Sequence, residues 1–345
     1  MRVGVETFRV NKRFALTISR GTTAQTTNVW VRVESDGIEG WGEASPFSIG
    51  DRRQNTETIL QALQEIAPAL EAFSPFERGQ IEEVLIASGL PSSARAGLDV
   101  ALHDWLGKRV GLPLWKLWGL NRNSIPPTSV TIGISSPEAA KARVRDWRTV
   151  TGAGFLKVKL GSPEGIEADR AMLMAVREEA PAAILSVDAN GGWSLDDALK
   201  MSVWLGDLGV KYLEQPLARG EEEKLPELHK RSPIPIFLDE SCFTSKDIPL
   251  LADRIHGVNI KLMKSGGLTE AIRMVNIAKA CGLQVMFGCY SDSTLANTAA
   301  AQLSPLANYI DLDSQLNLID DPFKGAVVRD GRLLPNDLPG LGVTQ

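Results

Sequence analysis

Polar and apolar residues alternate along the first part of the chain, as they do in strands that bury one face. The clearest run is 28–34, Asn-Val-Trp-Val-Arg-Val-Glu, and an Asp-Gly pair at 36–37 follows it. Such a pair is typical of a tight hairpin turn. Residues 40–43, Gly-Trp-Gly-Glu, continue as a further strand. The pattern between residue 3 and about residue 45 therefore predicts an antiparallel meander.

A helical period replaces this alternation over residues 56–72 and 92–108. The apolar face of the second range consists of Leu98, Ala101, Leu102 and Trp105, which recur at i, i+3, i+4 and i+7. Strands followed by helices predict a small α+β unit. Turn-forming residues between 121 and 127 place the end of this unit near residue 122.

Beyond this boundary, short apolar runs alternate with amphipathic segments such as 167–178. The runs predict eight strands, at 128–134, 155–160, 184–189, 210–215, 235–239, 257–262, 284–288 and 309–312. Eight strands that alternate with helices indicate a closed barrel of the (β/α)8 type. A doubly wound open sheet has the same local pattern, so the strand count alone does not separate the two folds.

Charged side chains recur at the C-terminal ends of these strands. They are Lys157 and Lys159 on the second strand, Asp188, Glu214 and Asp239 on the next three, Lys261 on the sixth, and Asp311 and Asp313 on the last. A single acidic residue at a strand end more often caps a helix than binds a ligand. A set that recurs with each βα unit points to one mouth, where the active site of a barrel is expected.

The chemistry of this set favours a metal and a carbon acid. Three converging carboxylates repel one another unless a divalent cation neutralises them, and an all-oxygen site suits Mg²⁺. Lys159 and Lys261 are expected on opposite sides of the barrel, with their pKa values lowered by the cation and by other lysines, so that they act as bases near neutral pH. A cation on a substrate carboxylate would stabilise the charge left when the α-proton is removed. We therefore expect a small-molecule carboxylate as the substrate.

Composition excludes several other classes of function. The chain has 37 Lys and Arg against 42 Asp and Glu, a net charge of −5, and no basic block, so nucleic acid is not an expected partner. We find neither a signal peptide nor an apolar run long enough to cross a membrane, and we expect a cytoplasmic protein. The three cysteines form no CxxC pair and the three histidines no HxH or HExxH motif, which argues against zinc sites and histidine-dependent triads.

The motifs resemble those of the enolase superfamily, in its muconate-lactonizing-enzyme subgroup, and most closely those of dipeptide epimerases. The similar segments are 40–44, 94–104, Lys157-Val-Lys159, Asp188-Ala-Asn190, Glu214-Gln-Pro216, Asp239-Glu-Ser241 and 259–267. The resemblance implies an α/β fold with an α+β capping domain at 1–122, a modified TIM barrel, (β/α)7β, at 123–320, and a tail at 321–345 that packs back on the cap. Relatives are often oligomeric, so a homo-oligomer is also implied.

The resemblance also implies roles for the charged residues. Asp188, Glu214 and Asp239 would bind Mg²⁺, Lys159 and Lys261 would be the acid/base catalysts, and Lys157 would give electrostatic support. The pair Asp311-Leu-Asp313 matches the DxD motif with which dipeptide epimerases hold a free α-ammonium group, and it favours epimerisation of the C-terminal residue of a dipeptide. N-succinylamino-acid racemase and o-succinylbenzoate synthase are the nearest alternatives. A non-catalytic barrel that binds a metal or a carboxylate is a remote one.

Two loops bear on the choice of substrate. Arg20 lies in the first capping loop and Arg52 and Arg53 in the second, which suggests an acidic side chain and an L-Ala-D/L-Glu type of activity. After the seventh strand, Gly288-Cys-Tyr-Ser-Asp292-Ser replaces the run Gly-x-Met-x-Glu-x-Ser found in many relatives. Asp292 is one methylene shorter than the usual Glu, and we expect it in the substrate pocket.

Overall fold

The N-terminal sheet of the computed structural model, which describes residues 1–345, has three antiparallel strands. They are β1 (Arg2–Ile18), β2 (Gly21–Ser35) and β3 (Ile38–Ala44). Asp36 and Gly37 both have positive φ, 53° and 72°, so they form the primed turn that a right-handed hairpin prefers. Val29, Val31 and Val33 of β2 are fully buried. The predicted meander is confirmed.

Three helices pack against this sheet, α1 (Thr56–Leu70), α2 (Arg78–Ala87) and α3 (Ser92–Val110). Added Cβ atoms at Gly40 and Gly42 of β3 would collide with the backbone of α3, which explains the Gly-Trp-Gly sequence. The ranges of α1 and α3 agree with the helical pattern. The sequence did not predict α2 or the hairpin of β4 (Phe47–Ile49) and β5 (Arg52–Gln54).

Eight parallel strands form a single sheet in chain order. They are β6 (Val130–Ile132), β7 (Phe155–Lys159), β8 (Ile184–Asp188), β9 (Leu213–Glu214), β10 (Ile236–Leu238), β11 (Gly257–Ile260), β12 (Gln284–Gly288) and β13 (Tyr309–Asp311). A bridge between Thr128 and Ile310, with a 3.1 Å hydrogen bond from Ser129 N to Ile310 O, joins the last strand to the first. This closure identifies a barrel and rules out the open sheet.

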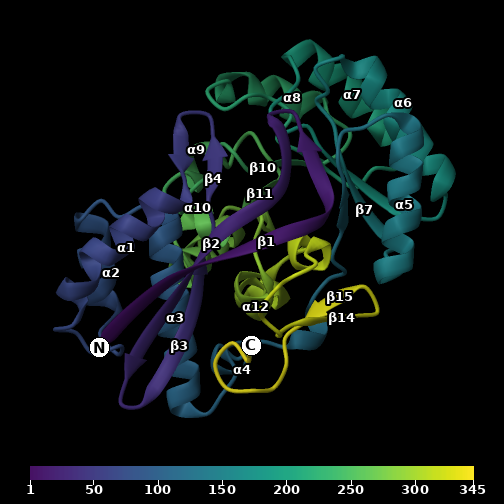
Figure 1. Cartoon of the computed structure of the whole chain (residues 1–345). Helices are drawn as coiled ribbons and strands as arrows, with labels where there is room; N and C mark the ends of the chain where they lie inside the picture. Colours follow the sequence, from purple (N-terminus) through teal and green to yellow (C-terminus); the bar gives the residue numbers. More distant parts are fainter.

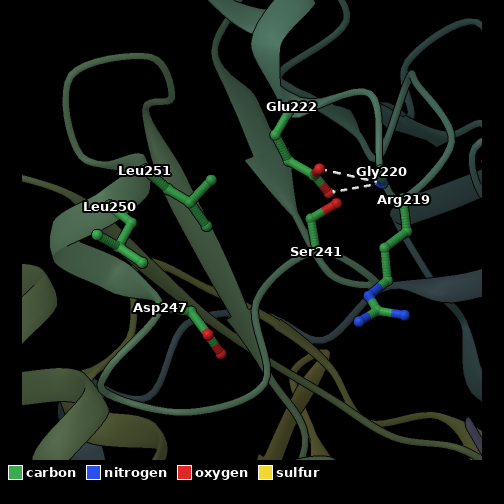
Figure 2. Close-up of a pocket in the computed structure, with 7 residues that line it drawn as sticks. All are labelled: Arg219, Gly220, Glu222, Ser241, Asp247, Leu250 and Leu251. Carbon is green, nitrogen blue, oxygen red and sulfur yellow. Dashed lines mark hydrogen bonds between the residues drawn. The ribbon is translucent and has the colours of Figure 1, made fainter.

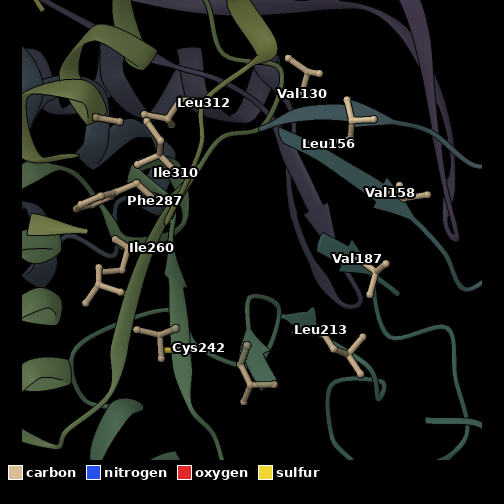
Figure 3. Packing of buried hydrophobic residues seen from close by; sticks show 14 of the residues in the cluster. Val130, Leu156, Val158, Val187, Leu213, Cys242, Ile260, Phe287, Ile310 and Leu312 are labelled. Carbon is tan, nitrogen blue, oxygen red and sulfur yellow. The ribbon is translucent and has the colours of Figure 1, made fainter. Parts of the chain in front are cut away.

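Helices follow the first seven of these strands. The main helices are α5 (Pro137–Thr151), α6 (Ile166–Glu179), α7 (Leu195–Asp207), α8 (Leu225–Arg231), α9 (Ile248–Leu251), α10 (Leu262–Ser265), α11 (Leu268–Ala280) and α12 (Thr294–Leu303), with short turns η2 (Glu222–Lys224) and η3 (Ser304–Leu306). After β13 the only helical element is the 3₁₀ turn η4 (Ser314–Asn317), which confirms the (β/α)7β form. Apolar side chains such as Val158, Val187 and Phe287 fill the buried core (Figure 3).

The remaining elements lie at the junction of cap and barrel. Short helices α4 (Leu114–Leu117) and η1 (Arg122–Ser124) lead into the barrel, and strands β14 (Val327–Arg329) and β15 (Arg332–Leu334) follow it. The C-terminal segment returns toward α3 and β3 (Figure 1). Phe323 packs edge-on against Phe8 and Trp30 of the cap sheet. These contacts support our proposed division into a cap (1–122), a barrel (123–320) and a returning tail (321–345).

None of the helices combines the length and the apolar character that a membrane crossing requires.

Candidate active site

Strand register brings the charged residues to one end of the barrel. Lys159 of β7 is paired with Asp188 of β8, and Asp188 with Glu214 of β9. Glu214 is in turn paired with Phe237 of β10, so that Asp239 lies two residues beyond this partner. Because adjacent parallel strands lie about 4.8 Å apart, the three acidic residues occupy neighbouring positions at the same mouth.

Lys157 lies at the centre of this group and is fully buried. Its Nζ is 2.6 Å from Glu214, 2.7 Å from Asp311 and 3.5 Å from Asp188. Burial by itself lowers the pKa of Lys157, but the carboxylates of Asp311 and Glu214 outweigh it and raise the pKa well above its usual value. The ammonium group therefore neutralises acids from three different strands.

Lys159 and Lys261 face the acids from opposite sides. Four strand steps separate β7 from β11, which is half of an eight-stranded barrel. Lys159 Nζ is 2.6 Å from Asp188, and Lys261 Nζ is 2.7 Å from Asp239. The sequence predicts lowered pKa values for the two lysines. For Lys261 this expectation is wrong as far as the surrounding protein groups are concerned. Burial lowers the pKa of Lys261, but the carboxylate of Asp239 outweighs burial, and the pKa lies well above its usual value.

The donor set of the three acids fits a hard cation. Asp188, Glu214 and Asp239 are buried and offer only oxygen. Burial and the nearby Asp188 carboxylate raise the pKa of Glu214 to about 7, as expected for acids that repel one another. Two further buried oxygens beside them, Asn190 Oδ1 and Glu240 Oε2, have no hydrogen-bond partner. These residues could hold a magnesium ion.

The carboxylates do not form a ready-made cluster of three metal ligands. Each is paired with an ammonium group instead, and Asp239 has two such partners, because Lys264 Nζ also lies 2.7 Å from it. A cation at this position would therefore replace lysine partners of the acids.

The two acids of the DxD motif differ in their surroundings. Asp311 accepts hydrogen bonds from Lys157 Nζ and from Ser129 Oγ, at 2.7 and 2.6 Å. Asp313 accepts one from the backbone N–H of Thr131 at 2.7 Å. Burial and the charge of Asp311 raise the pKa of Asp313 to about 6. The negative charge of Asp313 is thus less compensated by neighbouring groups than that of Asp311.

The three arginines of the two cap loops do not gather in one place. Arg20 Nη2 is 2.9 Å from Oε1 of the buried Glu240, and its Nη1 donates to Asn190 O at 3.0 Å. The guanidinium of Arg52 lies 4.2 Å from the centre of the Phe243 ring, and Arg53 is exposed. Of the three, only Arg20 is paired with a buried acid at the end of the barrel where the acidic residues gather.

Asp292 lies beneath the cap and is buried. Its Oδ1 accepts a hydrogen bond from the hydroxyl of Ser45, and its Oδ2 accepts one from Tyr290 N at 3.2 Å. Both oxygens are thus engaged within the protein. The shorter side chain serves here to join the seventh barrel loop to the cap.

A cavity of about 450 Å³ opens at the mouth between cap and barrel. Its walls include Arg20 and Gly50 of the cap and Gly161, Asn190 and Glu240 of the barrel loops. A second hollow, of about 390 Å³, shares Arg219 with it and is lined by Arg219, Gly220, Glu222, Ser241, Asp247, Leu250 and Leu251 (Figure 2). Of the predicted site residues, Arg20 lines the first cavity and none lines the second. The first cavity is also lined by Asn190, which donates a hydrogen bond to Asp188, and by Glu240, which directly follows Asp239, so we place the candidate active site there.

Comparison with known families agrees with this architecture. Residues 2–119 match the model of the mandelate racemase/muconate lactonizing enzyme N-terminal domain, and residues 139–345 match the enolase C-terminal domain-like model. The chain belongs to the mandelate racemase/muconate lactonizing enzyme family of the enolase superfamily. The resemblance of its motifs to this superfamily is thereby confirmed.

Curated members of this family resemble the chain over nearly its whole length. A hydrophobic dipeptide epimerase from Roseobacter litoralis is 46% identical over 99% of this chain and 98% of its own. An L-Ala-D/L-Glu epimerase from Bacteroides thetaiotaomicron is 37% identical over 97% of this chain and 86% of its own.

Solved structures in the family have the same fold. A dipeptide epimerase from Enterococcus faecalis, complexed with Mg and L-Leu-L-Tyr, superposes with a TM-score of 0.92 at 30% identity and covers 100% of this chain and 99% of its own. An L-Ala-D/L-Glu epimerase from Bacillus subtilis, with bound substrate, has a TM-score of 0.93 at 28% identity over 99% and 98% of the two chains.

Three residues of the site were not singled out from the sequence. They are Glu240, which pairs with Arg20, Lys264, which pairs with Asp239, and Tyr290, whose ring lies 4.5 Å from Lys261 Nζ. Glu240 directly follows the predicted ligand Asp239, and Lys264 lies three residues after the predicted base Lys261. Both lie in motifs shared with the family, and this placement is the sequence signal that could have identified them. Tyr290 stands where many relatives have Met, and a departure from the family pattern was its signal.

Proposed function

We propose that this protein is a magnesium-dependent dipeptide epimerase, an isomerase that inverts the α-carbon of the C-terminal residue. The observation that carries the proposal is the placement of Lys159 and Lys261 half a barrel apart, with Asp188, Glu214 and Asp239 on the strands and strand ends between them. An α-carbon held between two amines can lose its proton on one face and gain one on the other.

Each group of residues has one task in this reaction. One of the two lysines accepts the α-proton, and the other donates a proton to the opposite face. Asp188, Glu214 and Asp239 would hold Mg²⁺, which supplies an electrostatic partner for the negative charge that develops on the substrate carboxylate. Lys157 adds a fixed positive charge at the centre of the site.

The DxD motif is proposed to receive the free ammonium group of the dipeptide. Asp313 is the better candidate for this contact, because Lys157 already offsets the charge of Asp311. A succinylated substrate has no cation for this acid. The motif thus supports a dipeptide over N-succinylamino acids and the substrate of o-succinylbenzoate synthase.

We favour an uncharged C-terminal side chain over an acidic one. The guanidinium of Arg20 is already paired with Glu240, and neither Arg52 nor Arg53 lines the cavity, so the three loop arginines present no unpaired cation to it. The 46% identical relative named a hydrophobic dipeptide epimerase supports the same choice. An L-Ala-D/L-Glu activity requires Arg20 to leave Glu240.

The test is incubation in D₂O with Mg²⁺ and a panel of L,L-dipeptides that includes Ala-Glu, hydrophobic and cationic members. We expect deuterium at the α-carbon of the C-terminal residue, detected by mass spectrometry and NMR, and no exchange after treatment with EDTA. Exchange only in N-succinylamino acids, or turnover only to o-succinylbenzoate, would contradict the proposal. Absence of reaction with every compound would favour a non-catalytic barrel.

A further inference from the structure

The side chain of Lys261 runs along the end of the seventh barrel strand. In the register of β11 and β12, Ile260 is paired with Phe287, which places Lys261 beside Gly288. A Cβ atom added at Gly288 would lie 3.0 Å from Lys261 Cε and 2.7 Å from Asn259 Oδ1. The missing side chain at Gly288 therefore leaves the space through which the lysine reaches the mouth.

The ammonium group of Lys261 ends over an aromatic ring from the same segment. Its Nζ lies 4.5 Å from the centre of the Tyr290 ring, two residues beyond Gly288, and 2.7 Å from Asp239 Oδ2. A lysine has four rotatable bonds, so a single ion pair leaves its amine poorly fixed. The ring supplies a second contact, of the cation–π type, from another strand end.

Tyr290 is itself held by the cap. The ring of Phe47 in β4 stacks on it, with 4.9 Å between centroids and 4° between planes. Phe47 belongs to the small apolar cluster that joins the β4–β5 hairpin to the barrel, with Met263 and Phe243, and Tyr290 packs against this cluster. The tyrosine hydroxyl is buried and has no hydrogen-bond partner in the protein. The protein therefore uses the ring, not the hydroxyl, to make these contacts.

We propose that Tyr290 is a positioning residue that fixes the amine of Lys261 for proton transfer, and that Phe47 couples this position to the cap. The inference rests on the proposed function, because Lys261 must be one of the two acid/base groups. It predicts an asymmetric defect, since Tyr290 contacts Lys261, whereas Lys159 lies half a barrel away.

The experiment separates the two lysines by removing one at a time. In a Lys159→Ala background, exchange of the α-proton in D₂O depends on Lys261, and in a Lys261→Ala background it depends on Lys159. We expect Tyr290→Leu to slow the first exchange about tenfold or more and to change the second by less than about threefold. Tyr290→Phe, which keeps the ring, should restore the first exchange to within about threefold of its parent. Phe47→Leu should reproduce part of the Tyr290→Leu defect.

Three outcomes overturn the inference. Equal slowing in both backgrounds means that Tyr290→Leu disturbs the site as a whole, and a Tyr290→Phe variant as slow as Tyr290→Leu means that the hydroxyl is what matters. Crystal structures of the wild type and of Tyr290→Leu provide a readout that needs no turnover. We expect Lys261 Nζ over the ring in the wild type and displaced in the variant, and an unmoved amine contradicts the proposal. If the wild type exchanges no α-proton but Lys261 Nζ is displaced in Tyr290→Leu, the proposed function is wrong while the contact between Tyr290 and Lys261 stands.

Discussion

Arg20 of the cap and Glu240 of the barrel form an ion pair across the mouth, with 2.9 Å between Nη2 and Oε1. Glu240 is buried, and burial raises its pKa, while the guanidinium acts in the opposite direction. The pair connects the first cap loop to the strand end that carries Asp239. Arg20 therefore has a partner within the protein, which bears directly on substrate choice.

Replacing Arg20 by Ala is expected to lower kcat/KM about tenfold or more for neutral and acidic dipeptides alike. The reason is that Glu240 then remains buried without its partner. Steady-state kinetics with Ala-Glu and with a hydrophobic dipeptide check this. The double variant Arg20→Ala/Glu240→Gln is the control and should recover part of the loss. A defect confined to Ala-Glu would instead assign Arg20 to an acidic substrate side chain.

Replacing Lys159 or Lys261 by Ala is expected to lower epimerisation by about a thousandfold in each case, because both faces of the α-carbon need a proton-transfer group. Each single variant should still exchange the α-proton of the substrate configuration that faces the remaining lysine. Polarimetry measures the first quantity and NMR in D₂O the second. Normal epimerisation in either variant would contradict the two-lysine mechanism.

The affinity for the substrate should depend on the charge of Asp313. Burial and Asp311 raise the pKa of Asp313 to about 6, so its carboxylate is anionic above this pH and neutral below it. An ammonium group binds the anionic form, and KM should therefore rise as the pH falls through 6. A KM profile between pH 5 and pH 8 measures this limb. Asp313→Asn, which cannot ionise, should have a high KM with no such limb, and an unchanged profile would exclude Asp313 as the ammonium partner.

The buried Glu43 should make stability depend on pH. It accepts hydrogen bonds from Asn28 Nδ2 at 2.6 Å and from the backbone N–H groups of Ser293 and Ala296, at the start of α12. Burial, followed by the charge of Asp292, raises its pKa to about 8 from an ordinary value of 4.5. The folded state thus binds a proton that the unfolded chain releases, and its stability falls as the pH rises from about 4.5 to 8.

The matched control for this effect is Glu43→Gln, which is neutral at every pH. Chemical unfolding at pH 5 and at pH 8 should show that the wild type loses on the order of 1–3 kcal/mol more than the variant between the two values. Equal losses in both proteins would mean that Glu43 does not ionise in this range.

The strands of the barrel could be predicted because their information is local, whereas their closure into a barrel was implied only by the resemblance to the enolase superfamily. Each strand is a short apolar run, and the acids and lysines mark the strand ends, so the positions of Asp188, Glu214, Asp239 and Lys261 on the fold follow from period and spacing alone. The hairpin at Phe47–Gln54 was missed, because three-residue strands are too short to establish an alternation.

Contacts between cap and barrel could not be predicted in this way. Arg20 and Glu240 are far apart in the sequence, and their pairing depends on how the cap sits on the mouth. The same holds for Asp292, whose hydrogen bond from Ser45 crosses this interface. A residue type indicates which chemistry a side chain can perform, whereas its partner is decided by the tertiary packing.

The return of the tail has a consequence for protein engineering. Leu341 donates its backbone N–H to Asp104 of α3 at 2.7 Å, and a side chain at Gly340 would collide with the same carboxylate. The residues near the C-terminus thus pack against the cap, which is formed by the first third of the sequence. Chimeras that exchange specificity loops by transplanting a cap from a relative need to transplant its C-terminal residues as well, so the unit of recombination in this architecture is discontinuous in the gene.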